Sequence, residues 1–466
     1  MTDPLARLRA HAQLLAVAAP LLHACASPPG PNAEPQHQHQ GEGEERNLDL
    51  DHGAAIDERP NIVLILADDL GYECLGVNGG ESYLTPRLDR MAAEGVRFTR
   101  CHSTPLCTPS RVQLMTGRYS FRNYVRFGFL DPEEVTFARH LQDAEYDTAI
   151  VGKWQLTYGD VDPQRPAELG FDEWCLWNTN LPPGSRYADP QLDSGGRIRV
   201  HADAFGPDVL CDRAVALLEE EREVPLFLYY PMVLPHSPFV RPPGVDEAVE
   251  GAQGRFAAMV RHMDSLVGRV LDAAASPDRR RETLVIFVGD NGTDRRITSR
   301  WEGVDRAGVD IVGGKSRMNT HGTHVPMIAW WPGRAAPAAC EDLVDFTDFL
   351  PTLCEAAGVA LPETPKIDGR SFLPRLLGQP HAPREWIFCH YDPRWNVPGR
   401  PGRFAQDRTY RLHQDGALFH VERDPLGLHP IDEEAGGSRR RLQAVLDNMP
   451  AWTPPARARR PEASKD

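Results

Sequence analysis

The sequence predicts an α/β fold in which helices sandwich a mixed, mostly parallel β-sheet, followed by a small C-terminal α+β subdomain with a short antiparallel sheet. For the large sheet, short apolar runs rich in β-branched residues alternate with longer helical patterns. The chain of 466 residues, 41% of them hydrophobic, is also long enough to bury a large core. The small sheet is indicated by short apolar segments near the C-terminus, two of which flank the turn Gln414-Asp415-Gly416.

The strands of the large sheet are predicted from continuous apolar runs. Asn61 to Ala67, N-I-V-L-I-L-A, is bounded by Pro60 on one side and by Asp68-Asp69 on the other. A short apolar run with such boundaries is typical of a parallel strand that is buried on both faces. Further strands of this kind are expected at 148–151, 226–230, 284–288 and 327–331.

Helices are predicted where apolar residues recur at helical spacing between start and stop signals. Thr85-Pro86 opens one such helix, which ends at Gly95, and a long amphipathic helix from Ala252 ends before Ser276-Pro277. Other helices are expected at 110–115, 136–144, 206–221 and within 342–357, and the C-terminal strands are expected at 386–391, 409–413 and 417–422.

The N-terminal segment has the layout of an export signal. Two arginines precede an apolar run that ends at Leu22 and is too short to span a bilayer, and Ala24 directly precedes Cys25 as in a bacterial lipobox. We predict a signal peptide and lipobox over 1–25, and a mature protein anchored through a lipid on Cys25 in the periplasm or outer membrane of a bacterium. An ordinary signal peptide and a misassigned start codon are the alternatives. Residues 26–59 are rich in Pro, Gly, His, Gln and Glu, and we expect a disordered linker there.

The overall charge limits the kinds of partner. A formal net charge of -15 argues against nucleic acid or an anionic membrane surface as a general partner, so membrane contact is expected only through the anchor at Cys25. Of the nine cysteines, seven remain when Cys25 and Cys107 are set aside, and this odd number cannot pair completely. One disulfide is compatible with an exported protein, and no cysteine spacing indicates zinc.

The stretch from His102 to Gly117, H-S-T-P-L-C-T-P-S-R-V-Q-L-M-T-G, sets one cysteine at the start of a predicted helix. Pro109 suits the first helical turn, so free backbone N–H groups and a partial positive charge would face Cys107, with Arg111 one turn further on. Such a place favours anions. The structural alternative is a small buried cysteine in front of a core helix.

Oxygen-bearing side chains follow two of the predicted strands. Asp68 and Asp69 come directly after the first strand, and Asp290 and Asn291 lie in G-D-N-G after the strand at 284–288. The carboxyl ends of parallel strands meet at one edge of the sheet, where adjacent carboxylates repel each other unless a cation lies between them. Hard oxygen ligands suit Ca2+ and tolerate Mg2+. The alternatives are a helix N-cap for the first pair and a simple turn for the second.

A histidine follows another predicted strand. His236 lies in P-H-S-P-F after the strand at 226–230, on a loop held by two prolines. A histidine in this position can donate a proton to a leaving oxygen.

Several of these motifs together resemble a known family. C-T-P-S-R followed by L-M-T-G-R is similar to the type I sulfatases of the alkaline phosphatase superfamily, as are P-H-S-P-F, G-D-N-G, G-K-W-Q-L at 152–156 and the G-G-K before Val325-Pro326. The resemblance covers roughly residues 60–430. It implies an alkaline-phosphatase-like fold and an arylsulfatase-like sulfuric ester hydrolase. It also implies that a separate formylglycine-generating enzyme oxidises Cys107 to formylglycine.

The resemblance assigns a role to each matching residue. The formylglycine hydrate at position 107 attacks sulfur, Arg111 positions it, and His236 protonates the departing alcohol. Lys153 and Lys315 bind the sulfate group. The implied ligands of Ca2+, with Mg2+ tolerated, are Asp68, Asp69, Asp290, Asn291 and an oxygen on the former Cys107.

The sequence departs from the family pattern at two places. Gln155 stands where the family has a histidine that assists breakdown of the sulfated intermediate, and a glutamine cannot accept a proton at neutral pH. This difference concerns turnover more than binding. T-H-G-T-H replaces E-G-G-x-R after Lys315, so we infer no role for His321 or His324.

We therefore expect a catalytic domain over 60–368, a C-terminal subdomain over 369–440 and a tail over 441–466. The expected reaction is hydrolysis of an aryl sulfate or a sulfated carbohydrate. One alternative is a phosphonate monoester or phosphodiester hydrolase of the same superfamily. The other is a catalytically impaired lipoprotein that binds a sulfated glycan. The loops at 178–205 and 294–314 are expected to shape the substrate pocket, and their composition does not identify the substrate.

Overall fold

The computed structural model describes residues 59–157, 164–178, 185–276, 282–303, 306–392, 401–432 and 435–451. The predicted signal segment, all of the predicted linker except Arg59, and the part of the predicted tail beyond Ala451 lie outside the described residues.

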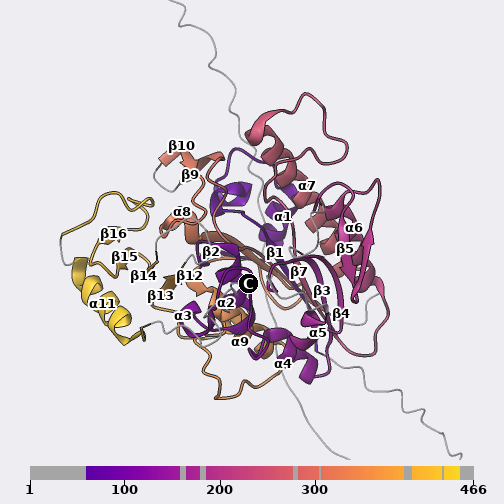
Figure 1. Cartoon of the computed structure of the whole chain (residues 1–466). Coiled ribbons are helices and arrows are strands. Elements are labelled where there is room, and N and C mark those ends of the chain that lie inside the picture. Colours follow the sequence, from indigo (N-terminus) through magenta and orange to yellow (C-terminus); the bar gives the residue numbers. More distant parts are fainter. Residues whose placement is uncertain are drawn as a thin grey trace, which may run out of the picture. The chain divides into compact units, whose positions relative to one another are not determined.

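A ten-stranded mixed sheet forms the centre of the described chain, in the order β12-β2-β11-β8-β1-β7-β3-β4-β5-β6 (Figure 1). Strands β8, β1, β7, β3 and β4 are parallel neighbours, whereas β11 and β5 run against the strands beside them. Their bounds are β1 (Asn61–Ala67), β2 (Val96–His102), β3 (Asp147–Trp154), β4 (Glu173–Asn178), β5 (Gln191–Ser194), β6 (Arg197–Val200), β7 (Leu226–Pro231), β8 (Thr283–Gly289), β11 (His324–Trp330) and β12 (Ala338–Asp345).

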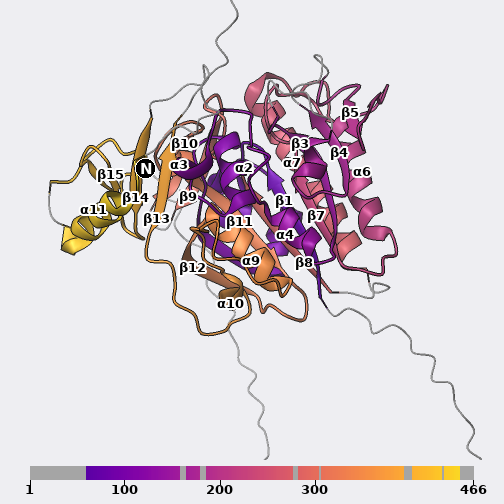
Figure 2. The same ribbon diagram turned by 60° about the horizontal axis from the view of Figure 1, so that its bottom comes forward.

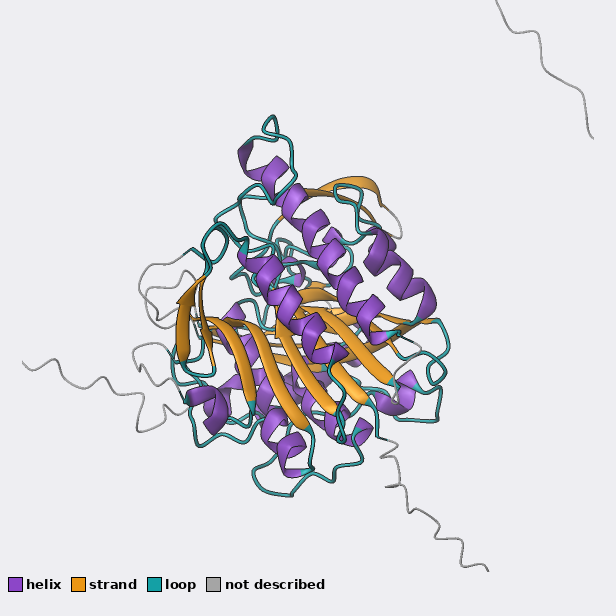
Figure 3. Cartoon of the chain, turned by 90° about the vertical axis from the view of Figure 1, so that its right-hand side faces the viewer, coloured by secondary structure: helices purple, strands orange, loops and turns teal. Residues whose placement is uncertain are grey.

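Helices cover both faces of this sheet, as Figure 3 shows. In β1, Val63 and Ile65 belong to the hydrophobic cluster that includes α1, α6 and α7, whereas Ile62 and Leu64 belong to the cluster that includes α2, α4 and α9. A strand with apolar residues on both faces is thus buried between two helical layers. The helices are α1 (Pro86–Glu94), α2 (Cys107–Thr116), α3 (Ser120–Asn123), α4 (Phe137–Asp143), α5 (Arg165–Glu168), α6 (Gly206–Glu219), α7 (Gly251–Ala274), α8 (Thr320–Thr323), α9 (Phe349–Ala356), α10 (Leu373–Leu376) and α11 (Ser438–Asn448).

A second, four-stranded antiparallel sheet follows in the C-terminal part, in the order β13-β14-β15-β16, with α11 beside it (Figure 2). Its strands are β13 (Ile387–Tyr391), β14 (Gly402–Gln406), β15 (Tyr410–His413) and β16 (Leu418–His420). The predicted fold class is therefore confirmed, both for the large mixed sheet and for the small antiparallel one. Strand β14 was not predicted from the sequence.

The helix predicted within 342–357 occupies only the later part of that range. The residues up to Asp345 complete β12, which pairs in parallel with β2, and α9 begins only at Phe349. Between them, Asp345 and Asp348 form a capping box around a single 3-10 turn, Phe346–Asp348. Pairing with a strand far away in the sequence decides the conformation of these residues.

The two predicted pocket loops contain strands of their own. Residues 294–314 include the antiparallel pair β9 (Thr298–Gly303) and β10 (Arg306–Val312), and residues 178–205 include β5 and β6. Eight cysteines lie in the described ranges, and all of them are buried and free of disulfide bonds. Within those ranges, no helix has the length and apolar character that crossing a membrane requires.

Candidate active site

The two predicted pairs of oxygen ligands lie side by side at the carboxyl ends of β1 and β8. Ala67 is in register with Gly289, so the residues that follow the two strands meet. The backbone N–H of Asp290 donates to the carbonyl of Ala67 at 2.9 Å, and that of Asp69 donates to Oδ1 of Asp290 at 2.9 Å. The side chains of both aspartates are buried. Neighbouring parallel strands thus bring together residues more than 200 positions apart.

The buried carboxylates perturb one another. Burial and then the neighbouring Asp68 raise the pKa of Asp290 to about 7. Burial alone would raise the pKa of Asp68 as well, but Lys153, His236 and Arg111 hold it well below its usual range. A bound cation would reduce the electrostatic repulsion between these carboxylates.

Each carboxylate also faces a basic side chain. The Nζ of Lys153 lies 2.8 Å from both carboxylate oxygens of Asp68, and the Nζ of Lys315 lies 2.5 Å from Oδ2 of Asp69. The guanidinium of Arg111 donates to Oδ2 of Asp290 at 2.9 Å. Three of the predicted catalytic cations therefore converge on the acidic cluster.

Cys107 is the first residue of α2, whereas the sequence predicts a helix over 110–115 with Cys107 just in front of it. Its N-cap residue, Leu106, offers no side-chain cap, so the helix presents free backbone N–H groups at this end. The loop in front of Cys107 is joined to the loop that carries Lys315, because the N–H of Ser316 donates to the carbonyl of Pro105 at 2.7 Å. Burial raises the pKa of the Cys107 thiol, although Lys153 and Lys315 are near enough to act in the opposite direction.

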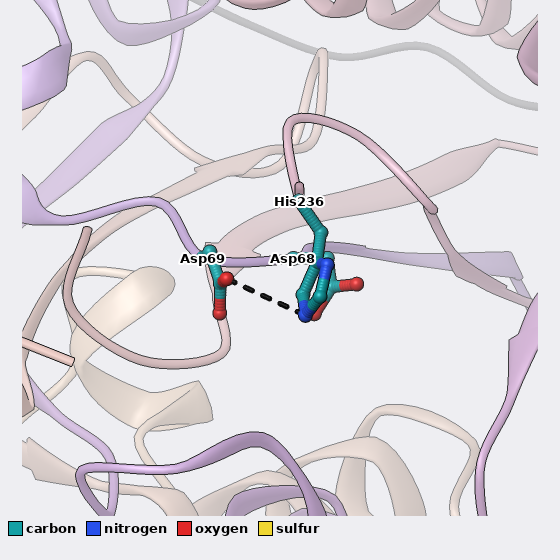
Figure 4. Close-up of side chains that lie close together, drawn as sticks. All are labelled: Asp68, Asp69 and His236. Carbon is teal, nitrogen blue, oxygen red and sulfur yellow. Dashed lines mark ion pairs between the residues drawn. The ribbon is translucent and has the colours of Figure 1, made fainter. Parts of the chain in front are cut away.

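His236 lies beside Asp68 and Asp69, the two aspartates that follow β1 (Figure 4). Its Nε2 is 3.5 Å from Oδ2 of Asp69 and 3.1 Å from the Nζ of Lys315, and its Nδ1 is 2.6 Å from the carbonyl of Ser237. Burial lowers the pKa of His236 to about 4, although Asp69 and Asp68 raise it. With Nδ1 donating to Ser237, Nε2 is the ring atom that faces the site.

The ligand atoms present here fit a hard divalent cation. One atom each from Asp68, Asp69 and His236 lie within 4.8 Å of one another. The amide nitrogen of Asn291 donates to Oδ1 of Asp69 at 2.9 Å, whereas its Oδ1 is buried without a hydrogen-bond partner. A buried carbonyl oxygen without a donor is costly, and a cation would satisfy it.

Gln155 lies directly after β3, two residues beyond Lys153. Its side chain is partly buried, and its Oε1 is buried without a hydrogen-bond partner. The residue therefore occupies the strand end where the family motif places a histidine, and its acceptor atom is available.

Sequence reasoning missed one cation of this site. The Nη1 of Arg186, from the segment between β4 and β5, lies 3.7 Å from Oδ2 of Asp68. No motif surrounds Arg186, and the only available indication was its position in the predicted pocket loop 178–205.

Comparison with known proteins agrees with this arrangement. The family model described as Sulfatase matches residues 60–359. The chain is 34% identical to human arylsulfatase A over 379 residues, covering 72% of this chain and 72% of that protein. It is 33% identical to mouse N-acetylgalactosamine-6-sulfatase over 357 residues, covering 70% and 67% of the two chains.

The structure also resembles a solved structure in its fold. The crystal structure of Ps i-CgsB in complex with k-i-k-neocarrahexaose superposes with a TM-score of 0.70 at 24% identity, covering 84% of this chain and 92% of that one. This likeness shows the shared fold, whereas the family match and the two relatives lead to the conclusion that the chain belongs to the sulfatase family.

Proposed function

We propose that the protein hydrolyses a sulfate ester to an alcohol and inorganic sulfate, with a formylglycine derived from Cys107 as nucleophile and with bound Ca2+. The observation that carries this proposal is the buried cluster in which basic side chains contact the three carboxylates that follow β1 and β8, with the unpaired Oδ1 of Asn291 on a side chain that donates to Asp69. Sulfate ester cleavage requires such an assembly, because charge builds up on the sulfuryl oxygens and on the leaving oxygen.

The ligands we propose for Ca2+, with Mg2+ tolerated, are Asp68, Asp69, Asp290, Asn291 and an oxygen of residue 107. When bound there, the ion would lower the pKa of the attacking hydroxyl and polarise the sulfuryl group.

Residue 107 needs its modification in order to react. The raised pKa of the Cys107 thiol disfavours the thiolate, which is the nucleophilic form of a cysteine. Formylglycine would supply a hydrated aldehyde with an oxygen nucleophile in the same place. A formylglycine-generating enzyme is therefore a required partner for maturation.

Side chains of the protein would then orient residue 107, neutralise the sulfate group and transfer protons. Arg111 orients residue 107, while Lys153 and Lys315 neutralise the sulfate oxygens. As the bond between sulfur and the alcohol oxygen breaks, His236 gives that oxygen the Nε2 proton of its imidazolium form, which it has first taken up from solvent, and returns to the neutral ring with Nδ1–H on Ser237. Gln155 can hydrogen-bond to the group at position 107 during sulfate release but cannot take up its proton.

The substrate we propose is an aryl sulfate or a sulfated carbohydrate, in line with the names of the relatives. We propose a catalytic domain over 60–368, a C-terminal subdomain over 369–440 and a tail over 441–466. We further propose export through the segment 1–25, with an anchor at Cys25 that holds the protein in the periplasm or at the outer membrane of a bacterium.

The test begins with protein co-expressed with a formylglycine-generating enzyme. We expect the tryptic fragment from Cys101 to Arg111 to lose about 18 Da, the difference between a thiol and an aldehyde at Cys107. Cys107→Ala should abolish sulfate release from 4-nitrophenyl sulfate without changing the circular dichroism spectrum. Cys354→Ala, at a buried cysteine of α9, should retain activity and serves as the matched control. Sulfate release by Cys107→Ala would overturn the nucleophile assignment.

Gln155 favours one other function, a lipoprotein that binds sulfated glycan without turning it over. Tight glycan binding by the matured protein without sulfate release would support that function instead. Rates on aryl sulfate and phosphodiester substrates, measured side by side, separate the sulfatase from a phosphonate monoester or phosphodiester hydrolase.

A further inference from the structure

Arg186 places a guanidinium group at the acidic cluster without using all of its donors there. Its Nη1 is 3.7 Å from Oδ2 of Asp68, which is an ion-pair distance and too long for a hydrogen bond. That Nη1 is buried and has no hydrogen-bond partner. Lys153 already contacts both oxygens of Asp68 at 2.8 Å, so Arg186 is not needed to neutralise this carboxylate.

The guanidinium is held in a defined orientation. It lies over the indole ring of Trp177, 4.1 Å from the ring centroid, at the end of β4. Only 14% of the Arg186 side chain is exposed. A planar cation fixed on an aromatic face loses little further freedom when it binds a ligand.

The residue next to Arg186 is hydrogen-bonded to the loop that carries His236. The hydroxyl of Tyr187 donates to the carbonyl of Val233 at 3.0 Å and also contacts the carbonyl of His236. The N–H of Gly206 donates to the carbonyl of Tyr187 at 2.6 Å. These contacts join the residue next to Arg186 to the loop that carries His236.

We propose that Arg186 binds a non-bridging oxygen of the substrate's sulfate group and so acts as a substrate-binding cation alongside Lys153 and Lys315. This inference rests on the sulfatase function proposed above and deepens it. A guanidinium suits the task because two of its N–H groups can donate side by side to two oxygens of a sulfate or carboxylate. Its permanent charge would also add to the site a cation that Gln155 cannot provide.

The test uses the matured full-length protein with Arg186→Gln and Arg186→Lys. Inorganic sulfate is titrated calorimetrically in the presence of Ca2+, and KM and kcat are measured with 4-nitrophenyl sulfate. Losing one charged hydrogen bond to an oxyanion should weaken sulfate binding about tenfold in Arg186→Gln and raise KM about equally, with kcat changed far less. Arg186→Lys should fall between this variant and the wild type.

A Ca2+ titration separates this role from a merely structural one. Removing a positive charge near Asp68 should leave Ca2+ affinity unchanged or increase it, while sulfate affinity falls. Arg199→Gln, at an exposed position of β6, is the matched control and should change neither affinity.

Unchanged sulfate affinity in Arg186→Gln would overturn the inference, and so would a parallel loss of sulfate and Ca2+ affinity. If Arg186→Gln fails to fold, Arg186→Lys decides by the same two titrations. If the wild type hydrolyses sulfate esters while the Arg186 variants match it, only this inference fails. If the wild type hydrolyses none, the proposed function fails, and the sulfate titrations still decide the role of Arg186.

Discussion

At the scale of single residues, Gln155 is the position where this chain departs most clearly from the chemistry its other motifs predict. It follows Lys153 by two residues at the end of β3 and keeps an unpaired Oε1. A glutamine can orient a group, but it cannot act as a general base at neutral pH. The step that should suffer is the release of sulfate from residue 107, because this step requires a proton to be removed.

We predict that the matured wild type shows burst kinetics with 4-nitrophenyl sulfate, because alcohol release would be faster than sulfate release. Gln155→His should reduce the burst and raise kcat about 100-fold, the lower end of what a general base contributes. Rapid-mixing measurement of nitrophenol release tests both expectations. Gln164→His, at an exposed position, is the control. A wild type without a burst would show that Gln155 does not limit turnover.

The site residues differ in how far they could be predicted from the sequence. Asp68 and Asp290 directly follow apolar strands, and His236 lies on the loop after a third. Ligands bind beyond the strand ends in such folds. Arg186 reaches the same place through a loop, and only the folded chain shows its contact with Trp177 and Asp68.

At the scale of elements, β3 carries Lys153 to the site, and Gly152 directly before it is required by the backbone. Strand β3 pairs with β7 only as far as Ile150, and Gly152 has a φ of 136°, in a region that favours glycine. A Cβ at Gly152 would lie 2.0 Å from the carbonyl oxygen of Pro231 in β7. The close approach of two backbones therefore requires glycine immediately before Lys153.

We predict that Gly152→Ala lowers the free energy of unfolding by about 3 kcal/mol or more, because a backbone clash adds to the strain of a positive φ. Sulfate release should fall as well, because Lys153 must shift with the strand. Gly195→Ala is the control, since its φ is 59° and no atom lies within 4 Å of the added Cβ. It should cost only about 1–2 kcal/mol. Urea denaturation of both variants measures the difference, and equal losses would show that the clash is relieved elsewhere.

At the scale of the whole catalytic unit, a polar layer joins the large sheet to the small one. The ring of His324 stacks between Tyr72 and His102, at centroid distances of 4.0 and 5.1 Å. The amide of Gln406 in β14 lies 3.2 Å from the Nε2 of His102 in β2. Gln406 is in register with the buried Arg411, which donates to the hydroxyl of Thr320.

The buried histidines of this layer should make the folded protein less stable as the pH is lowered. Removal from water lowers the pKa of His324 to about 4, with Arg100 and His321 acting in the same direction and a hydrogen bond to Thr99 opposing them. Burial likewise lowers the pKa of His321 to about 4 and that of His102 well below its usual range, and the nearby Arg411 adds to both shifts. In the unfolded chain these groups titrate near pH 6.5.

The sign follows from proton linkage. Between about pH 6.5 and 4 the unfolded chain binds more protons than the folded one, so the free energy of unfolding falls as the pH is lowered. His324→Phe should flatten this dependence, although the lost hydrogen bond to the carbonyl of Thr99 lowers stability near pH 7 by about 1 kcal/mol. Thermal unfolding at half-unit pH steps tests this, with the exposed His429→Phe as control. An unchanged slope in His324→Phe would exclude this histidine as a source.

The sequence by itself determined the fold class, the strand β1 and the residues that follow the buried strands, because a buried parallel strand needs a continuous apolar run and its end carries the polar residues. It did not determine β2, β12 or β14. Strand β2, V-R-F-T-R-C-H, alternates apolar and polar residues only as far as Thr99, which is a weak local signal for a strand. Only pairing with β11 and β12 settles its conformation.

The tertiary structure also decided which charges meet. Arg186 contacts Asp68, and Gln406 contacts His102, across more than 100 residues of chain. The spacing of apolar residues along the sequence indicates which face of a helix or strand is buried. This spacing does not indicate which segment packs against that face, because the partner can be distant in the sequence.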